Sequence, residues 1–197
     1  MREIKKTDFK VTEWSGGKTT QLYILPEGAD FSKRDFDFRI SSASFTDTSS
    51  NFSDFSGYQR YILPLQGFID VEYEGLYNRH LEPFEVEYFD GRWKTYSENS
   101  LDTLDYNFIV RNGSNATMEI VREAKEVKAD GYKLYVFAPE DYKAELNGES
   151  KDMNAWSLYI IEEDFKITDL QKPIKYVNIS RTLLTAQSQV DKGSFYL

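Results

Sequence analysis

Apolar and polar residues alternate along most of this chain, and apolar residues rarely recur at the spacing of a helix. Because successive side chains of a β-strand point to opposite faces of a sheet, this alternation predicts strands. The clearest predicted strands are Phe36 to Ala43, Tyr58 to Leu65, Phe68 to Tyr73 and Leu104 to Val110. Other short strands are predicted at 4–11, 19–25, 84–89, 93–96, 118–121, 133–137, 142–146, 155–161, 165–168 and 174–179. Many short strands at this density predict an all-β sandwich or barrel.

The composition of the chain excludes or disfavours several classes of function. The net charge is -9, which disfavours nucleic acid as a partner because DNA binding needs a basic surface. The chain has no cysteine, so disulfides and thiolate chemistry are excluded. No stretch approaches the roughly 20 apolar residues of a membrane helix, and the first residues lack the apolar run of a signal peptide. We therefore expect a cytoplasmic protein with no membrane partner.

Metal and nucleophile chemistry find little support in the sequence. The only histidine is His80, so a three-histidine centre is excluded, and we expect neither a metal nor a cofactor. There is no Gly-x-Ser-x-Gly nucleophile motif. The fragment Gly17 to Thr19 resembles the end of a phosphate-binding loop, but Thr12 stands where that motif needs its first glycine. A turn into a strand is the simpler interpretation.

Polar side chains on the faces of the predicted strands are the strongest functional signal. Arg39 and Ser41 share one strand face, Asp105 and Asn107 share another, and Arg60 interrupts a third strand. If these faces meet, two guanidinium groups line one cavity, and each offers a planar fork of donors to a carboxylate. Asp105 would neutralise and orient one arginine, and Asn107 would supply an amide. In the opposing interpretation, the arginines lie on a solvated sheet face in weak ion pairs.

Four segments together point to a family. They are Trp14 to Thr20 (WSGGKTT), Phe36 to Ala43 (FDFRISSA), Phe52 to Arg60 (FSDFSGYQR) and Asp105 to Phe108 (DYNF). In order and spacing they resemble the HutD/Ves proteins, whose patterns are W-x-N-G-G-G-x-T, W-R-x-S-x-A, F-S-x-F-P-G-x-x-R and D-F-N. The likeness covers about the first 110 residues, and only the strand-rich pattern extends it into the second half.

The resemblance implies an all-β bicupin, that is, two packed jelly-roll-like cupin barrels without metal-binding histidines. We expect residues 1–122 to form the first half and 123–197 the second, within one intertwined compact unit. The family implies binding of a small carboxylate such as N-formylglutamate, and a role in limiting histidine utilisation rather than catalysis. The positions that match the family's motifs are Trp14, Thr19, Thr20, Arg39, Ser41, Arg60, Asp105 and Asn107. The first loop departs from the pattern, with Lys18 in place of a glycine, so the ligand can differ from that of the histidine pathway.

Other functions stay open at this point. One is a cupin-fold isomerase or hydrolase that uses Asp105 or His80 as a general base. Another is an interaction module with a filled barrel and no cavity beside Arg39. The oligomeric state also stays open, with a homodimer as one expectation.

Overall fold

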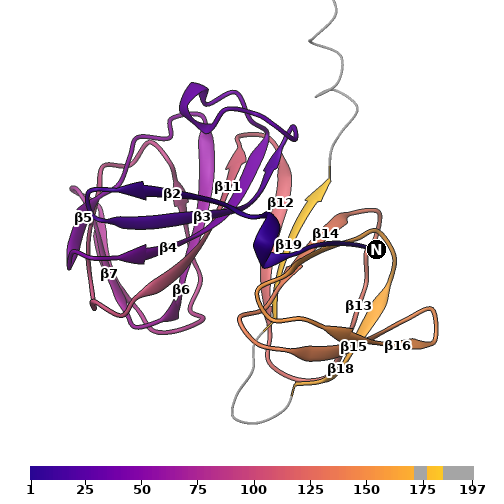
Figure 1. The fold of residues 1–197 in the computed structure, drawn as a ribbon. Helices are drawn as coiled ribbons and strands as arrows, with labels where there is room; N and C mark the ends of the chain where they lie inside the picture. The colour runs from indigo at the N-terminus through magenta and orange to yellow at the C-terminus, as the bar shows by residue number, and fades with distance from the viewer. Residues whose placement is uncertain (171–176, 184–197) are drawn as a thin grey trace, which may run out of the picture. The chain divides into compact units, whose positions relative to one another are not determined.

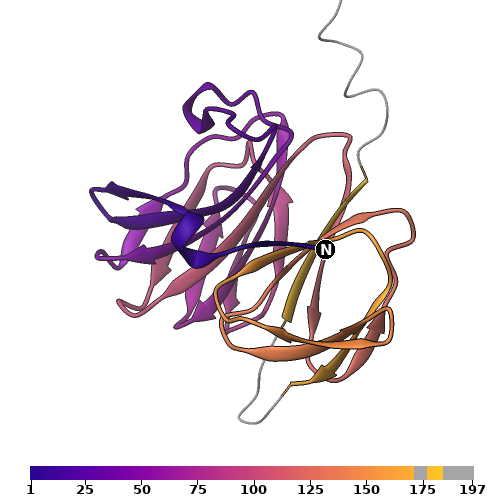
Figure 2. The same ribbon diagram turned by 45° about the vertical axis from the view of Figure 1, so that its right-hand side comes forward.

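The computed structural model describes residues 1–170 and 177–183, and this part of the chain is nearly all β (Figures 1 and 2). The all-β prediction is therefore confirmed. The chain divides into two compact units. The N-terminal unit consists of Ile4–Asn112 and Trp156–Leu158. The C-terminal unit consists of Met1–Glu3, Gly113–Ala155 and the described residues from Tyr159 onward.

The N-terminal unit has two antiparallel sheets. The six-stranded sheet has the order β2 (Lys10–Trp14), β3 (Gly17–Leu25), β4 (Phe38–Phe45), β11 (Leu104–Arg111), β6 (Tyr58–Gln66) and β9 (Glu87–Asp90). The four-stranded sheet has the order β5 (Ser49–Asn51), β10 (Thr95–Asn99), β7 (Ile69–Tyr73) and β8 (Tyr77–Leu81). The unit also has two short 3-10 helices, η1 (Lys6–Asp8) and η2 (Phe31–Lys33).

A hydrophobic core joins the two sheets of the N-terminal unit. Ile62 and Phe89 of the six-stranded sheet pack with Val71, Tyr73 and Leu81 of the four-stranded sheet, and all five are buried. Burying such a side chain stabilises the fold by roughly 1.5–3 kcal/mol. This core fills the space beside Ile62. Arg60 lies two positions before Ile62 on β6 and on the same face of the strand. It lines a cavity of the N-terminal unit.

The C-terminal unit repeats the two-sheet arrangement. Its five-stranded sheet has the order β1 (Arg2–Ile4), β17 (Leu158–Ile161), β14 (Lys133–Phe137), β19 (Val177–Leu183) and β12 (Asn115–Val121). Its four-stranded sheet has the order β13 (Lys125–Val127), β18 (Phe165–Asp169), β15 (Tyr142–Leu146) and β16 (Glu149–Met153). Residues 124–131, which have the composition of a connector, contain β13, which pairs with β18.

Several strand predictions need correction. The predicted strand 4–11 is broken by η1, and β2 begins only at Lys10 and continues to Trp14. Every side chain of β2 is exposed, so this edge strand has no alternation that could reveal it. The polar strands β5, β8 and β16 were also missed, because most of their side chains are exposed. The predicted strand at 174–179 lies partly outside the described residues, which resume with β19 at Val177.

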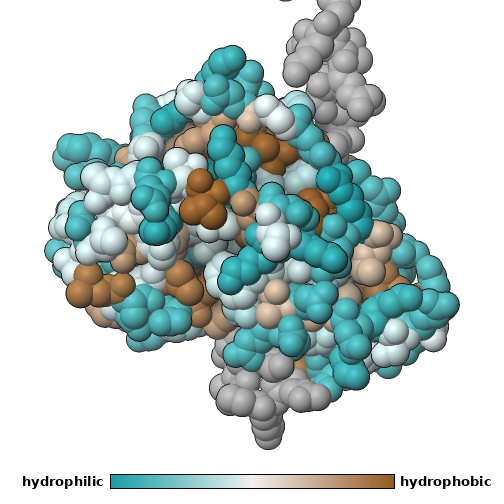
Figure 3. Space-filling model, viewed as in Figure 1, coloured by the Kyte–Doolittle hydropathy of each residue, from teal (hydrophilic) through white to brown (hydrophobic). Residues whose placement is uncertain are grey.

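The face of the molecule in Figure 3 is mainly hydrophilic, with hydrophobic residues in small separate groups. Within residues 1–170 and 177–183, no helix has the length and apolar character needed to cross a membrane.

Candidate binding site

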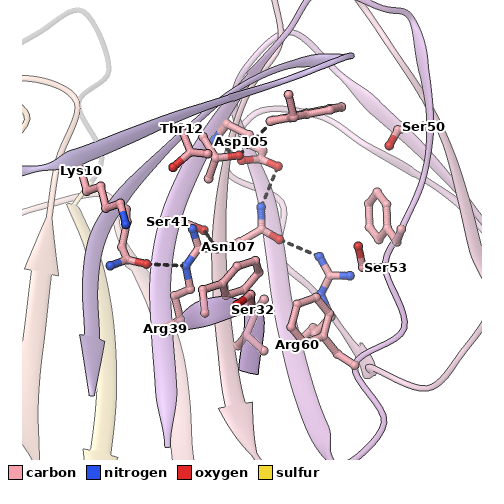
Figure 4. Close-up of a pocket in the computed structure, with 18 of the residues that line it drawn as sticks. Lys10, Thr12, Ser32, Arg39, Ser41, Ser50, Ser53, Arg60, Asp105 and Asn107 are labelled. Carbon is pink, nitrogen blue, oxygen red and sulfur yellow. Dashed lines mark hydrogen bonds between the residues drawn. The ribbon is translucent and has the colours of Figure 1, made fainter. Parts of the chain in front are cut away.

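A cavity of about 750 Å³ opens in the N-terminal unit (Figure 4). Its floor is formed by the neighbouring strands β3, β4, β11 and β6, and β2 forms part of one side. The rest of the wall comes from two loops, Gly28 to Ser32, which includes the start of η2, and Phe52 to Phe55, and from Ser50 and Asn51 of β5. The second loop contributes two phenylalanines, Phe52 and Phe55, so it folds back onto the body of the unit.

Strand register aligns the two arginines across the floor. Arg39 on β4 lies opposite Ile109 on β11, and Ile109 lies opposite Arg60 on β6. In the next row of the same face, Asn107 lies opposite Ser41. Neighbouring strands are about 4.8 Å apart, so the Cα atoms of the two arginines are separated by about 10 Å. Both guanidinium groups therefore reach the same cavity from strands that flank β11 (Figure 4).

The guanidinium group of Arg39 is held on three sides. Its Nε donates to Oε1 of Gln21 over 2.9 Å, and Nη1 donates to Oγ of Ser41 over 3.1 Å. Its Cζ lies 4.0 Å from the ring centroid of Phe31, a cation–π distance. These contacts fix the direction of the planar fork, which reduces the ordering cost of binding an anion.

The guanidinium group of Arg60 lies among three phenyl rings. Its Cζ is 4.6 Å from the ring centroid of Phe52, 5.1 Å from that of Phe89 and 5.4 Å from that of Phe55. Its Nη2 donates to Oδ1 of Asn107 over 3.0 Å. Its Nε is buried and has no hydrogen-bond partner among the described residues. Arg60 is thus a buried cation whose polar neighbours satisfy only part of its hydrogen-bonding capacity.

Asp105 is buried behind Asn107. Its Oδ2 accepts a hydrogen bond from Nδ2 of Asn107, and its Oδ1 accepts one from the backbone N–H of Ala43, both over 2.6 Å. The sequence predicted that Asp105 pairs with an arginine. No ion pair joins Asp105 to Arg39 or Arg60 in the described part of the chain, because Asn107 stands between Asp105 and Arg60 and links them by hydrogen bonds (Figure 4).

Burial governs the ionisation of all three charged groups. It lowers the pKa of Arg39 and of Arg60 to about 10, against the opposing attraction of Asp105. It raises the pKa of Asp105 to about 6, against the hydrogen bonds from Ala43 and Asn107 and the charges of the two arginines. At neutral pH the floor therefore carries two positive charges and one negative charge, which favours an anion in the cavity.

Seven of the eight predicted site residues line this cavity: Trp14, Thr19, Arg39, Ser41, Arg60, Asp105 and Asn107. Thr20 does not, because it follows Thr19 on β3 and its side chain points to the opposite face of the sheet. His80 also lies elsewhere, exposed on β8 between the carboxylates of Asp70 and Glu82. Its position excludes it as a general base in this cavity.

Other residues that line the cavity were missed in the sequence, and three of them make contacts or carry a charge that bears on binding. Gln21 alternates with Thr19 on β3, so strand periodicity could have found it once Thr19 was chosen. Lys10 lies on the exposed edge strand β2, and Phe31 lies on η2, where no local pattern points toward the cavity. Among residues 1–170 and 177–183, no group of three or more His, Asp or Glu side chains is placed to hold a metal ion.

The two-sheet units and the cavity between strands and loops define a cupin-like, all-β protein. The HutD family model matches residues 6–175, and the chain belongs to the HutD family. No curated protein sequence matches it.

Solved structures share the fold across almost the whole chain. A conserved protein of unknown function from Pseudomonas aeruginosa PAO1 is 23% identical with a TM-score of 0.76, over 92% of this chain and 97% of that chain. HutD from Pseudomonas fluorescens SBW25, in a formate condition, is 21% identical with a TM-score of 0.75, over 93% and 99%. Ylba from E. coli is 10% identical with a TM-score of 0.65, over 92% and 90%. At these identities the likeness concerns the fold alone.

Proposed function

We propose that this HutD-family protein binds a small carboxylate metabolite in the cavity, with Arg39 and Arg60 as the groups that hold the carboxylate. One observation carries the proposal. Two buried guanidinium groups face the same cavity, while the buried carboxylate of Asp105 bonds to Asn107 and to the backbone of Ala43 rather than to either arginine. Neither arginine is thus in a direct ion pair within the floor, and a bound anion would compensate the excess of positive charge.

The geometry supports moderate affinity. Hydrogen bonds to charged groups contribute roughly 1.5–3 kcal/mol each. The ordering cost of binding removes several kcal/mol of that gain, which leaves an affinity in the micromolar to millimolar range. Such values suit the sensing of a metabolite.

N-formylglutamate is the ligand that family membership favours. It has two carboxylates for the two arginines and a formamide that complements the amide of Asn107 and the hydroxyl of Ser41. Formate is its smallest relevant fragment, and HutD from Pseudomonas fluorescens was studied in a formate condition. In this proposal the protein acts in the cytoplasm and limits flux through histidine breakdown by binding an intermediate, without turning it over.

Calorimetric titration tests the proposal. N-formylglutamate, glutamate and formate are titrated into the unmodified protein and into Arg39→Ala, Arg60→Ala and the control Arg92→Ala. Arg92 is exposed and does not line the cavity. We expect binding of at least one acid, unchanged in Arg92→Ala and weakened at least tenfold, about 1.4 kcal/mol, in the other two variants.

Two outcomes of the titration would contradict the proposal. No heat with any acid, or full affinity in both Arg39→Ala and Arg60→Ala, would overturn the proposal. Circular dichroism tests whether each variant is folded. If an alanine variant is not, Arg39→Lys or Arg60→Lys keeps the charge and removes only the planar fork.

A second candidate function is favoured by the raised pKa of Asp105. A carboxyl group with a pKa of about 6, next to a cavity, is suited to act as a general base in an isomerase or hydrolase. Turnover of a bound acid that disappears in Asp105→Asn would favour the enzyme. Binding without any turnover over long incubation would favour the sensor.

A further inference from the structure

At the end of the cavity away from the arginines, two aromatic side chains meet across a glycine. Trp14 on β2 lies opposite Gly17 on β3, and Gly17 lies opposite Phe45 on β4. The rings of Trp14 and Phe45 are 6.1 Å apart at 85°, an edge-to-face pair. A side chain at position 17 could not fit, because its Cβ would lie 2.0 Å from the carbonyl oxygen of Ser44. Only glycine therefore fits on β3 between the two aromatic residues.

The indole ring of Trp14 is held in place. Its Nε1 donates to Oγ1 of Thr19 over 3.1 Å, so its one polar group is satisfied within the protein. The backbone of Gly16 lies against the ring, since a Cβ at that position would be 2.3 Å from the indole. Trp14 nevertheless has 40% of its surface exposed, and it lines the cavity. A fixed, exposed aromatic surface of this kind is suited to contact a ligand.

The aromatic pair and the arginines belong to one continuous cavity but lie far apart along it. Arg39, Ser41, Ala43 and Phe45 share one face of β4, and all four line the cavity. Six residues of strand correspond to about 20 Å between the Cα atoms of Arg39 and Phe45. A five-carbon acid is no longer than about two residues of extended chain, roughly 7 Å. Such an acid, held at the arginines, would leave the aromatic end empty.

The size of the cavity agrees with a larger ligand. A volume of about 750 Å³ lies within the range of about 300–1,000 Å³ that is typical of pockets for drug-sized molecules. We propose that the ligand of this site is an organic acid with a planar aromatic or heteroaromatic group, whose ring lies against Trp14 and Phe45 while its carboxylate reaches Arg39 and Arg60. This inference rests on the proposed function: it keeps the carboxylate site at the two arginines, but it replaces N-formylglutamate by a longer acid that carries a ring.

Paired acids that differ only in the ring provide the test. Acetate, propionate, butyrate and hexanoate are compared by calorimetry with their ω-phenyl derivatives, and 3-cyclohexylpropionate is compared with 3-phenylpropionate. We expect at least one phenyl acid to bind about tenfold or more tightly than the unsubstituted acid of the same length. The cyclohexyl acid should bind less tightly than the phenyl acid, because only a planar ring can stack on the indole.

Variants of Trp14 locate the ring. In Trp14→Ala the affinity ratio between each phenyl acid and its parent acid should fall to near one, and in Trp14→Phe most of the ratio should return. Trp93→Phe is the matched control, because Trp93 packs against Tyr73 and Tyr77 and does not line the cavity. Its ratio should stay unchanged.

The outcomes separate this inference from the proposed function. If short acids bind through the two arginines and no phenyl acid binds more tightly, the inference is wrong and the proposed function stands. If the ratio survives in Trp14→Ala, the ring binds elsewhere and the inference is also wrong. If neither series binds but N-formylglutamate, glutamate or formate does, this inference is wrong and the proposed function stands. If none of these acids binds, both proposals are wrong.

Discussion

The buried carboxyl group of Asp105 should make the stability of the N-terminal unit depend on pH. Only 3% of the residue is exposed, and burial raises its pKa from the ordinary 3.8 to about 6. Between pH 3.8 and about pH 6, the carboxyl group of Asp105 is protonated in the folded protein but has lost its proton in the unfolded chain. The free energy of unfolding that this group contributes is therefore highest below pH 4, and it falls as pH rises through 6.

The magnitude follows from the two pKa values. A difference of about two between them corresponds to about 3 kcal/mol over the whole titration, at 1.36 kcal/mol per pKa unit. About half of this change, roughly 1.5 kcal/mol, falls between pH 5 and pH 7.5. In Asp105→Asn the side chain keeps its shape but cannot titrate, so its contribution to the pH profile should be flat.

Urea unfolding of the unmodified protein and of Asp105→Asn between pH 5 and pH 8 measures this effect. Tryptophan fluorescence is a suitable signal, because all three tryptophans, Trp14, Trp93 and Trp156, belong to the N-terminal unit. We expect the unmodified protein to lose about 1.5 kcal/mol relative to the variant as pH rises from 5 to 7.5. Groups common to both proteins cancel in this difference.

Two results would refute the reasoning. Parallel profiles, within about 0.5 kcal/mol, would mean that Asp105 does not titrate in this range. A difference of the opposite sign would mean that the two arginines stabilise the carboxylate more than burial penalises it. Either result would also weaken the case for Asp105 as a general base.

Three further predictions follow from the same geometry. Affinity for a carboxylate should rise several-fold from pH 7.5 to pH 5.5 as Asp105 becomes neutral, and calorimetry should find no such rise in Asp105→Asn. The hydrogen bond to Asp70 raises the pKa of His80, so the His80 pKa measured by NMR should fall toward about 6.5 in Asp70→Asn. The small stability that this exposed pair provides, below about 1 kcal/mol, should be lost as pH rises through the folded pKa of His80. Gly17→Ala should lower the urea midpoint by an amount equivalent to about 1–3 kcal/mol, because its Cβ would collide with the backbone of Ser44, and an unchanged midpoint would contradict the close approach.

The strands that carry the site could be predicted because their signal is local. Alternation assigned Arg39 and Ser41 to one face of β4, and Asp105 and Asn107 to one face of β11. The buried apolar residues on the opposite faces made that alternation clear. The edge strand β2 is exposed on both faces, so no comparable pattern marks its bounds or its cavity side. The predicted strand 4–11 includes Lys10 but does not show that Lys10 lines the cavity.

Relations between strands required the tertiary structure. Arg39 and Arg60 lie opposite the same residue, Ile109, only because β11 inserts between β4 and β6 from much later in the chain. The sequence suggested direct pairing of Asp105 with an arginine, whereas register places Asn107 between Asp105 and Arg60.

The sequence by itself determined the all-β class, the strands of the floor, the absence of cysteine chemistry and seven of the residues that line the cavity. Only the tertiary structure decided that Thr20 and His80 lie outside the cavity, that Asp105 is buried without an ion pair to either arginine, and that an aromatic pair faces the cavity's far end. The reason is physical. Alternation is fixed by the backbone of each strand, whereas register, loop placement and burial depend on contacts between segments that are distant in the sequence.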